Sequence, residues 1–267
     1  MMDRLSPPER AKLFSAYHAM SFIEDGMKLG LGTGTTAAWL VKLLGAKVHL
    51  DGLEIEGVAT STQTHELAVS VGISMNDLDH FNWLDLTIDG ADEFDPLLTL
   101  IKGGGGALLQ EKIVATASER MVVISDPSKQ VDTLGAFPLP VEVVQFGRET
   151  TRGIIEDKIS DLQGEFHKTS WRMSGADRFV TDEGHALLDL HLGAIKNVDA
   201  LSEGLLSIPG VVETGLFIDI ADTVIIGAAS GEARLVSSDE DEKVIDVADQ
   251  SEFERLVARI DETGGFV

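Results

Sequence analysis

Ten residues near the start of the chain decide the fold, and they read MKLGLGTGTT from Met27 to Thr36. The first five are a short, largely apolar strand, and the glycine and threonine run that follows is a loop. A helix is predicted directly after this loop, with apolar residues from Trp39 to Leu44 on it. A strand, a glycine-rich turn and a helix in this order are expected to begin a parallel sheet.

The alternation of strands and helices continues along the first half of the chain. The pattern predicts strands at residues 55–60, 84–88 and 121–125, with helices at 62–71 and 106–117 between them. An earlier helix is expected from Ser6, which supplies a capping hydroxyl before two prolines, to about Gly26. This order indicates an α/β fold with a doubly wound, mainly parallel sheet of the Rossmann-like kind.

The pattern changes near residue 130, which predicts a second, smaller α+β domain. An extended stretch at 137–144, a helix at 148–162 and strands near 179–180 and 187–190 belong to it. Strands at 215–226 are expected to return to the first domain. The predicted domains are therefore residues 1–130 with 206–235, residues 131–205, and an acidic linker with a C-terminal amphipathic helix at 236–267.

The C-terminal helix is expected near residues 251–260. Ser251 and Glu254 have the spacing of a capping box, and four apolar residues share one face of the helix. This face is expected to pack either on the core of its own chain or on a partner subunit.

Composition excludes several classes of function. The 267 residues contain no cysteine, and 45 acids against 21 bases give a net charge of −24. A surface so negative argues against nucleic acid and anionic membranes as partners. The chain shows neither a signal peptide nor an apolar run long enough to span a bilayer, so we expect a cytoplasmic protein. The acid excess indicates either an ordinary soluble surface or adaptation to high salt.

The loop from Gly32 to Thr36 has the composition of a phosphate-binding loop. Glycine backbone, threonine hydroxyls and a helix N-terminus all offer hydrogen-bond donors to an anion. The same residues also fit a loose dinucleotide fingerprint, Gly32-x-Gly34-x-x-Ala37, with Asp51 and Glu54 roughly 20 residues on. A plain tight turn is the third interpretation.

Two further segments carry candidate catalytic groups. The predicted strand at 84–88 is followed by Asp89, Gly90, Ala91, Asp92, Glu93 and Asp95. Ligands bind at such strand ends in open α/β sheets. A solvated acidic turn or a metal site would also account for these acids, although the segment lacks a nearby histidine.

The second segment is a lysine followed by four glycines at 102–106. Its backbone N–H groups can approach an anion closely, and Glu111 follows on a predicted helix, placed to act as a general base. Lys129, in a loop after a strand, and Lys12, on the first helix, are candidates to neutralise a phosphate. Each of these residues could also be an ordinary surface residue, and the seven histidines show no metal-ligand spacing.

Taken together, the motifs resemble those of the type A ribose-5-phosphate isomerase family. They occur in family order over roughly residues 10–230: GLGTGTT at 30–36, DGADE at 89–93, KGGG at 102–105, EKI at 111–113, SDPSKQV at 125–131, FPLPVEV at 137–143 and IPGVVETGLF at 208–217. This chain has Thr35 where serine is common, a different turn at 181–185 and a longer tail.

The resemblance implies an enzyme without cofactor or metal that interconverts ribose 5-phosphate and ribulose 5-phosphate. It implies that Glu111 moves a proton between C1 and C2, that Lys102 stabilises the oxyanion, and that Asp89 and Asp92 bind sugar hydroxyls. It further assigns substrate binding to the following positions: Thr33, Gly34, Thr35, Thr36, Gly90, Ala91, Gly103, Gly104, Gly105, Lys129 and Lys12. A homodimer or homotetramer is expected. A sugar-phosphate sensor, an amino-sugar phosphate deaminase, a coenzyme A transferase or a dinucleotide-dependent oxidoreductase are the alternatives.

Overall fold

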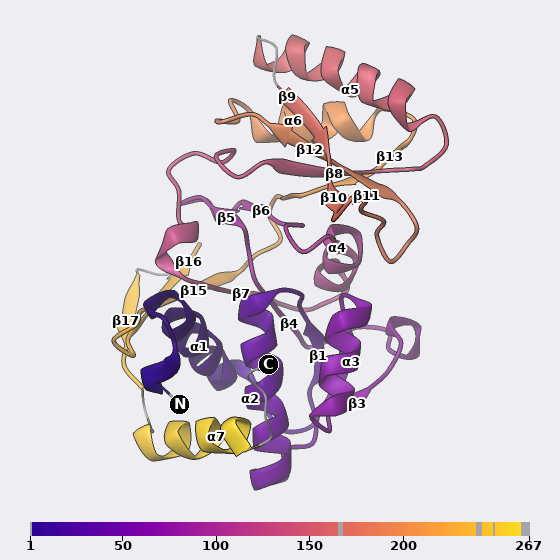
Figure 1. Cartoon of the computed structure of the whole chain (residues 1–267). Helices are drawn as coiled ribbons and strands as arrows, with labels where there is room; N and C mark the ends of the chain where they lie inside the picture. Colours follow the sequence, from indigo (N-terminus) through magenta and orange to yellow (C-terminus); the bar gives the residue numbers. More distant parts are fainter. Residues whose placement is uncertain (1, 165–167, 239–241, 248, 263–267) are drawn as a thin grey trace. The chain divides into compact units, whose positions relative to one another are not determined.

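The computed structural model describes residues 2–164, 168–238, 242–247 and 249–262, and its internal contacts divide the chain into two units (Figure 1). Unit 1 takes its described residues from Met1–Gly90, Ile113–Lys129 and Ile220–Val267, and unit 2 from Ala91–Lys112 and Gln130–Asp219. The contacts thus group residues 91–112 and 206–219 with unit 2, whereas the sequence analysis placed them in the main domain. The three predicted domains stay a prediction.

Unit 1 is built on one eight-stranded sheet. Six neighbouring strands, from β15 to β3 in sheet order, run parallel, and the hairpin of β16 and β17 continues the sheet antiparallel. The sheet order is β17 (Lys243–Ile245), β16 (Ala233–Ser237), β15 (Thr223–Gly227), β7 (Met121–Ser125), β4 (Leu86–Asp89), β1 (Lys28–Leu31), β2 (Glu56–Ala59) and β3 (Ser74–Met75). The predicted doubly wound, mainly parallel sheet is therefore confirmed.

Helices cover both faces of this sheet, which is why its central strands β4, β7 and β15 are buried along their whole length. On one face, α1 (Pro7–Ala19) and α2 (Thr35–Asp51) pack on each other and share a core with Leu29 and Leu31. A side chain at position 30 would point to the opposite face of the sheet, where a Cβ on Gly30 would lie 2.6 Å from Val114. Val114 belongs to α4 (Leu108–Thr116), within which the two units meet in sequence.

Apart from α7 (Gln250–Glu262) near the C-terminus, the remaining described helices of unit 1 are short. They are α3 (Thr62–Ser70) and the 3-10 turns η1 (Met2–Arg4), η2 (Met20–Phe22), η3 (Leu78–His80) and η4 (Pro127–Lys129). Ser6 caps α1 by accepting a hydrogen bond from the Glu9 N–H at 3.4 Å, as predicted. The helix ends earlier than predicted, because the chain tightens into η2 before the turn at Gly26.

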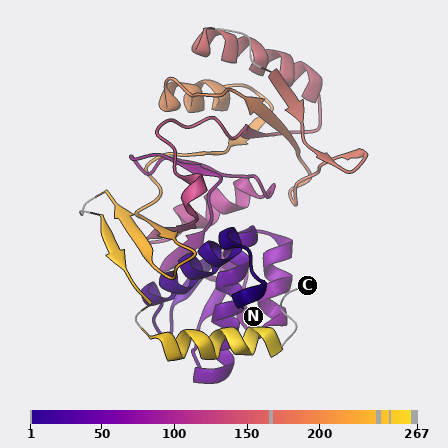
Figure 2. The same cartoon turned by 60° about the vertical axis from the view of Figure 1, so that its left-hand side comes forward.

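The C-terminal part of unit 1 corrects one prediction and confirms another. The acidic linker expected from residue 236 is flanked by the strands β16 and β17 of a hairpin, while residues 239–241 lie outside the described residues (Figure 2). The predicted helix is present as α7 (Gln250–Glu262), but Asp249 caps it instead of the predicted Ser251, since its Oδ1 accepts from the N–H groups of Ser251 and Glu252 at 2.9 Å. Its four apolar residues, Phe253, Leu256, Val257 and Ile260, are buried in the core formed with α1 and α2.

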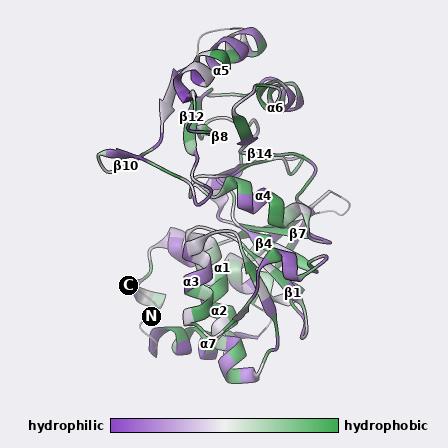
Figure 3. Cartoon of the chain, turned by 90° about the vertical axis from the view of Figure 1, so that its right-hand side faces the viewer, coloured by the Kyte–Doolittle hydropathy of each residue, from purple (hydrophilic) through white to green (hydrophobic). Residues whose placement is uncertain are grey.

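Unit 2 is an α+β unit, as predicted. Its main sheet is antiparallel and has the order β13 (Val211–Thr214), β8 (Leu139–Val143), β12 (Ala186–His191), β9 (Lys168–Trp171). The helices α5 (Arg148–Gln163) and α6 (Val198–Leu206) bury Ile155 and Leu201 in the same core as Val141 and Leu188. Figure 3 shows hydrophilic and hydrophobic residues alternating along α5, which fits a helix with one buried face.

Two smaller sheets complete unit 2. One joins β14 (Leu216–Phe217), β6 (Leu100–Ile101) and β5 (Glu93–Phe94), and the other is the hairpin of β10 (Met173–Ser174) and β11 (Asp177–Arg178). The strand predicted near 179–180 is β11, two residues earlier, and Val180 makes only an isolated bridge. Helix α6 was not predicted, although its N-cap Asn197 is a recognisable start signal. None of the described helices is long and apolar enough to cross a membrane.

Candidate active site

The glycine loop after β1 lies at the topological switch point of the sheet. The chain runs outward from β1 to β2 and β3, then returns to β4 on the other side of β1. In open α/β sheets, ligands bind at the carboxyl ends of the strands beside such a point. Gly32 follows β1, and Asp89 is the last residue of β4, so the structure brings these two predicted site residues together.

Only glycine fits at position 32. A Cβ there would lie 2.1 Å from Oδ1 of Asp89, which is far inside van der Waals contact. Gly34, with a φ of 108°, is the N-cap of α2 and supplies no capping side chain. The N–H groups of the first helical turn therefore face the loop without a side-chain acceptor at the cap, as in anion-binding loops.

Asp89 holds the loop in this shape. Its side chain is fully buried, and Oδ1 accepts hydrogen bonds from the N–H groups of Thr33 at 3.0 Å and of Gly90 at 2.6 Å. The carboxylate thus fixes two backbone segments at the ends of neighbouring strands.

A cluster of hydroxyls behind the loop was missed from sequence. Oγ1 of Thr33 lies 2.7 Å from that of Thr60 and 2.8 Å from Oγ of Ser61, while Thr64 donates to the carbonyl of Gly32 at 2.9 Å. The Thr33 hydroxyl is therefore tied into the protein. The available signal was the position of Thr60 and Ser61, directly after β2 at the same edge of the sheet.

The two predicted lysines of unit 1 lie near this edge. Nζ of Lys12 on α1 donates to Oγ1 of Thr35 at 3.0 Å and to Glu9 at 2.8 Å, so it contacts the glycine loop itself. Lys129 is half-buried in η4, directly after β7, the neighbour of β4. Thr36 follows Thr35 in the first turn of α2 and is half-buried.

Unit 2 carries a buried ion pair. Lys102 is 2% exposed and Glu111 3% exposed, and Nζ of Lys102 lies 3.3 Å from Oε1 of Glu111. Lys102 follows β6, and its N–H donates to the carbonyl of Gly215, while Glu111 lies in the first turn of α4. Moving both charges out of water is costly, so a pair that is kept buried suggests a role beyond stability.

A second lysine lies close to this pair. Lys102 and Lys112 both lie against the ring of Phe217. Nζ of Lys102 is 5.5 Å from the ring centroid, and Nζ of Lys112 is 4.9 Å from it. Burial lowers the pKa of Lys112, although its ion pair with Glu213 at 2.7 Å opposes this shift. Sequence reasoning assigned no role to either Lys112 or Phe217.

The acids that look alike in sequence have different partners. In unit 2, Oδ2 of Asp92 accepts from the N–H of Gly104 at 2.6 Å, so Asp92 contacts the predicted glycine loop. Glu93 is buried and accepts from the N–H groups of Gly135 and Phe137, and Asp95 caps a turn of its own loop. Glu93 and Asp95 are therefore structural.

The dinucleotide interpretation of the first loop is wrong. Its ribose-binding acid would have to follow β2, but Thr60 follows this strand. Asp51 is the last residue of α2 and pairs with Arg255 at 2.7 Å, and Glu54 precedes β2 at the opposite end of that strand. Among the residues that the structure describes, no cluster of three or more His, Cys, Asp or Glu side chains could hold a metal ion.

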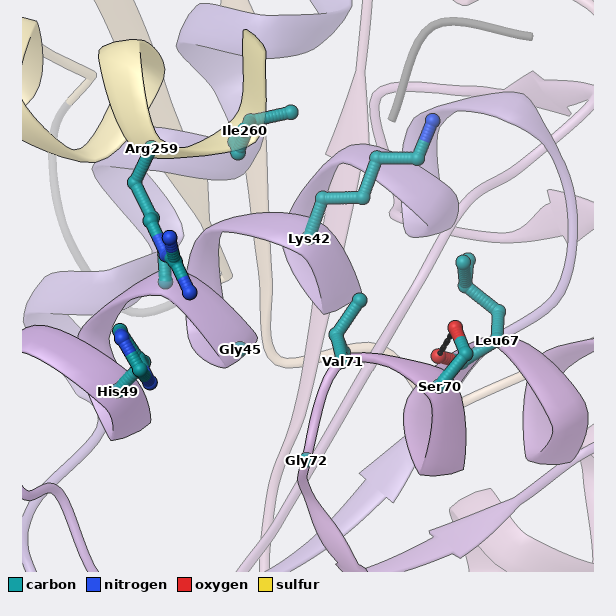
Figure 4. Close-up of a pocket in the computed structure, with 10 residues that line it drawn as sticks. Lys42, Gly45, His49, Leu67, Ser70, Val71, Gly72, Arg259 and Ile260 are labelled. Atoms are coloured by element: carbon teal, nitrogen blue, oxygen red, sulfur yellow. Dashed lines mark hydrogen bonds between the residues drawn. The ribbon is translucent and has the colours of Figure 1, made fainter. Parts of the chain in front are cut away.

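A cavity of about 550 Å³ in unit 1 lies apart from the loop (Figure 4). It is lined by the second half of α2, the end of α3 and α7, where Arg259 and His49 point toward one another. These helix ends lie at the amino-terminal edge of the sheet, so this cavity is not the predicted site.

The fold and these groups define a class of protein. A doubly wound sheet with a glycine loop and a helix N-terminus at its switch point, in a chain with a buried carboxylate–lysine pair, suits an enzyme that moves protons on a small anionic substrate. The sequence model of the family described as ribose 5-phosphate isomerase A (phosphoriboisomerase A) matches residues 56–231. The chain belongs to this family.

Individual relatives agree with this assignment. The ribose-5-phosphate isomerase A of Jannaschia sp. (strain CCS1) is 58% identical over 231 residues, which cover 86% of this chain and 88% of the relative. That of Ruegeria sp. (strain TM1040) is 53% identical and covers 98% of this chain and 100% of the relative. A solved D-ribose-5-phosphate isomerase in complex with phospho-erythronic acid is 37% identical, with a TM-score of 0.77, over 91% of this chain and all of the other.

Proposed function

We propose that Glu111 is the base in the isomerisation that family membership assigns to this chain. The chain is an isomerase that interconverts ribose 5-phosphate and ribulose 5-phosphate, an aldose and a ketose. The observation that supports this mechanism most is the buried pair of Glu111 and Lys102. The solved relative in complex with phospho-erythronic acid supports a sugar phosphate as substrate.

In the proposed reaction, Glu111 removes the proton from C2 of the open-chain aldose. The electrons of that C–H bond form a double bond between C1 and C2, and the C1 carbonyl oxygen becomes an oxyanion. Glu111 then returns the proton to C1, while the proton of the C2 hydroxyl moves to the C1 oxygen and leaves the ketone. No other reactant is needed.

Lys102 is the cation for the enediolate. When Glu111 takes up the proton, the negative charge moves from its carboxylate to the substrate oxygen, so a cation 3.3 Å from the carboxylate finds a new negative partner. A fixed charge in a dry environment stabilises such a developing oxyanion strongly, because little reorganisation is required.

The remaining predicted residues bind the substrate in this proposal. Asp89 and Asp92 contact sugar hydroxyls and assist ring opening, and the backbone of Gly90, Ala91 and the glycines 103–105 adds hydrogen bonds. The phosphate binds to the loop from Thr33 to Thr36, with Lys12 and Lys129. The N-terminus of α2 and the contact of Lys12 with Thr35 support this assignment.

The first test is replacement of the base. In Glu111→Gln the side chain keeps its volume but cannot accept the proton, so kcat should fall by about three orders of magnitude with little change in substrate affinity. Ribulose 5-phosphate formation is measured with EDTA and without added cofactor, and affinity by calorimetry. The matched control is Glu119→Gln, which should retain full activity. Glu119 is exposed and lies shortly after α4, the helix that carries Glu111.

Two results would count against this mechanism. A Glu111→Gln enzyme with near-normal turnover would exclude Glu111 as the base. Wild-type protein that binds ribose 5-phosphate but produces no ketose would point to a sugar-phosphate sensor.

We also propose that the enzyme is cytoplasmic, forms a homodimer or homotetramer, and is adapted to high salt. The family resemblance supports the assembly, and the net charge of −24 supports the adaptation. Light scattering at low and molar KCl measures the mass of the assembly, and a monomer at both salt concentrations would contradict the proposed homodimer or homotetramer.

A further inference from the structure

The glycine loop of unit 2 is held by an arginine to which the sequence analysis gave no role. Arg172 follows β9, and its Nη1 donates to the carbonyl oxygens of Gly103 and Gly104, the latter at 3.1 Å. The other side of the guanidinium is bound to Asp189 on β12: Nε lies 3.1 Å from Oδ2, and Nη2 donates to Oδ1. The side chains of Arg172 and Asp189 are each only 15% exposed.

This contact determines where the N–H groups of the loop point. In a trans peptide, the carbonyl and the following N–H point in opposite directions. A guanidinium that holds the carbonyls of Gly103 and Gly104 therefore directs the N–H groups of Gly104 and Gly105 away from itself. The N–H of Gly104 donates to Oδ2 of Asp92 at 2.6 Å, which is consistent with this direction.

The loop has no side chains with which to hold itself, so it depends on its neighbours. Gly103 and Gly106 have positive φ values, and the N–H of Gly106 donates to the carbonyl of Gly103 at 3.0 Å, which closes a turn. The ring of Phe179 blocks one side, since a Cβ on Gly106 would lie 2.4 Å from it. Gly104 and Gly105 remain exposed, so a ligand can reach their backbone.

The positive charge of Arg172 is neutralised by the carboxylate of Asp189, so Arg172 acts on the loop through its geometry and not through its charge. An arginine paired in two contacts with a carboxylate adds little net field at a distance. Its planar fork does what lysine cannot do, because it reaches two carbonyls and both carboxylate oxygens in one fixed geometry.

We propose that Arg172, anchored by Asp189, is a positioning residue of the isomerase: it sets the peptide planes of Gly103–Gly105 so that the backbone N–H of Gly105 donates to the enediolate oxygen. This inference rests on the proposed function. It assigns Arg172 no direct contact with the substrate, and it gives the glycine run a specific task, that of a backbone oxyanion donor beside the charge of Lys102.

The test compares Arg172→Gln and Arg172→Lys with the wild type below the melting temperature of each protein. A misplaced donor costs about 10²-fold, so kcat/KM of Arg172→Gln should fall about 100-fold, mostly in kcat. Lysine cannot span all four acceptors, so Arg172→Lys should lose at least about tenfold. The dissociation constant of phospho-erythronic acid, whose carboxylate resembles the enediolate, should rise more than the KM of ribose 5-phosphate.

The matched control is Arg178→Gln. Arg178 lies on β11 of the neighbouring hairpin and pairs with Glu149 at 2.8 Å, so it is a comparable arginine that does not bind the glycine loop. Its kcat/KM should stay within about twofold of the wild type. Asp189→Asn is the second test variant, since it keeps the shape of the side chain but weakens its hydrogen bonds to Arg172. It should show an intermediate loss even if Arg172→Gln does not fold.

The outcomes separate this inference from the proposed function. An inactive wild type would overturn the proposed function itself. An active wild type with a folded Arg172→Gln within threefold of its kcat/KM would overturn the positioning role. A uniform loss of affinity for substrate and analogue, in step with a lower melting temperature, would show that Arg172 only stabilises unit 2.

Discussion

Single buried residues set how this molecule responds to pH. His18 on α1 is 5% exposed, and its Nε2 donates to the carbonyl of Gly231 at 2.9 Å. Burial lowers its pKa below the ordinary value of 6.5, and the hydrogen bond to Gly231 opposes this only in part. The imidazole is therefore neutral in the folded protein at pH values where the unfolded chain is already protonated.

The sign of the effect on stability follows from this difference. Well above pH 6.5 His18 is neutral in both states, and its contribution to stability is complete. As the pH falls through 6.5, the unfolded state binds the proton first, so the free energy of unfolding decreases, by up to about 1.4 kcal/mol per pH unit. In His18→Gln, which keeps a donor for Gly231, this part of the slope should vanish.

Urea unfolding between about pH 5 and pH 8 measures both slopes. The control His65→Gln, an exposed histidine on α3, should leave the slope unchanged. Identical slopes for wild type and His18→Gln would show that His18 is not responsible.

At the scale of elements, helix α7 lies outside residues 56–231, which match the family model, yet it is part of the core of unit 1. Its Phe253 stacks on Phe14 at 4.9 Å between ring centroids and meets Tyr17 edge-on at the same distance. Arg255 pairs with Asp51 at the end of α2. Of the two sequence-based expectations for this helix, packing on its own core is thus confirmed.

Removing that ring should destabilise the protein strongly. Phe253→Ala should lower the free energy of unfolding by about 3–5 kcal/mol, because it leaves a cavity in the aromatic cluster. Glu254→Ala, next to it on the exposed face, should change stability by less than about 0.5 kcal/mol. Denaturant unfolding compares the two, and a Phe253→Ala protein as stable as the control would mean that α7 contributes little to the folded state.

At the scale of the whole molecule, charge dominates the expected response to solvent. The 45 acids outnumber the 21 bases, so the excess negative charges repel one another. Salt shortens the range of this repulsion to about 3 Å at 1 M. The melting temperature should therefore rise from dilute buffer to molar KCl, and NaCl at equal ionic strength should have a similar effect. Equal melting temperatures in dilute buffer and in molar KCl would contradict adaptation to high salt.

Much of the chemistry could be predicted from sequence because it depends on local patterns. The strand–loop–helix from Met27 onward, the α/β alternation and the family motifs around Glu111 are all contiguous in the chain. Backbone geometry and the hydrophobic period act over a few residues, so they can be read from the letters. The fold class was accessible in this way, and the family motifs identified the isomerase family with Glu111 as its candidate base and Lys102 as its candidate cation.

Only the tertiary structure decided which side chains are partners. The hydroxyls behind Thr33, the burial of Lys102 with Glu111 and the grip of Arg172 on Gly103 all join residues from separate elements. In the sequence, Glu93 and Asp92 are neighbouring acids, yet one holds a structural loop and the other the glycine turn. Partner choice depends on distances set by packing across the sheets, and these distances have no local signature in the chain.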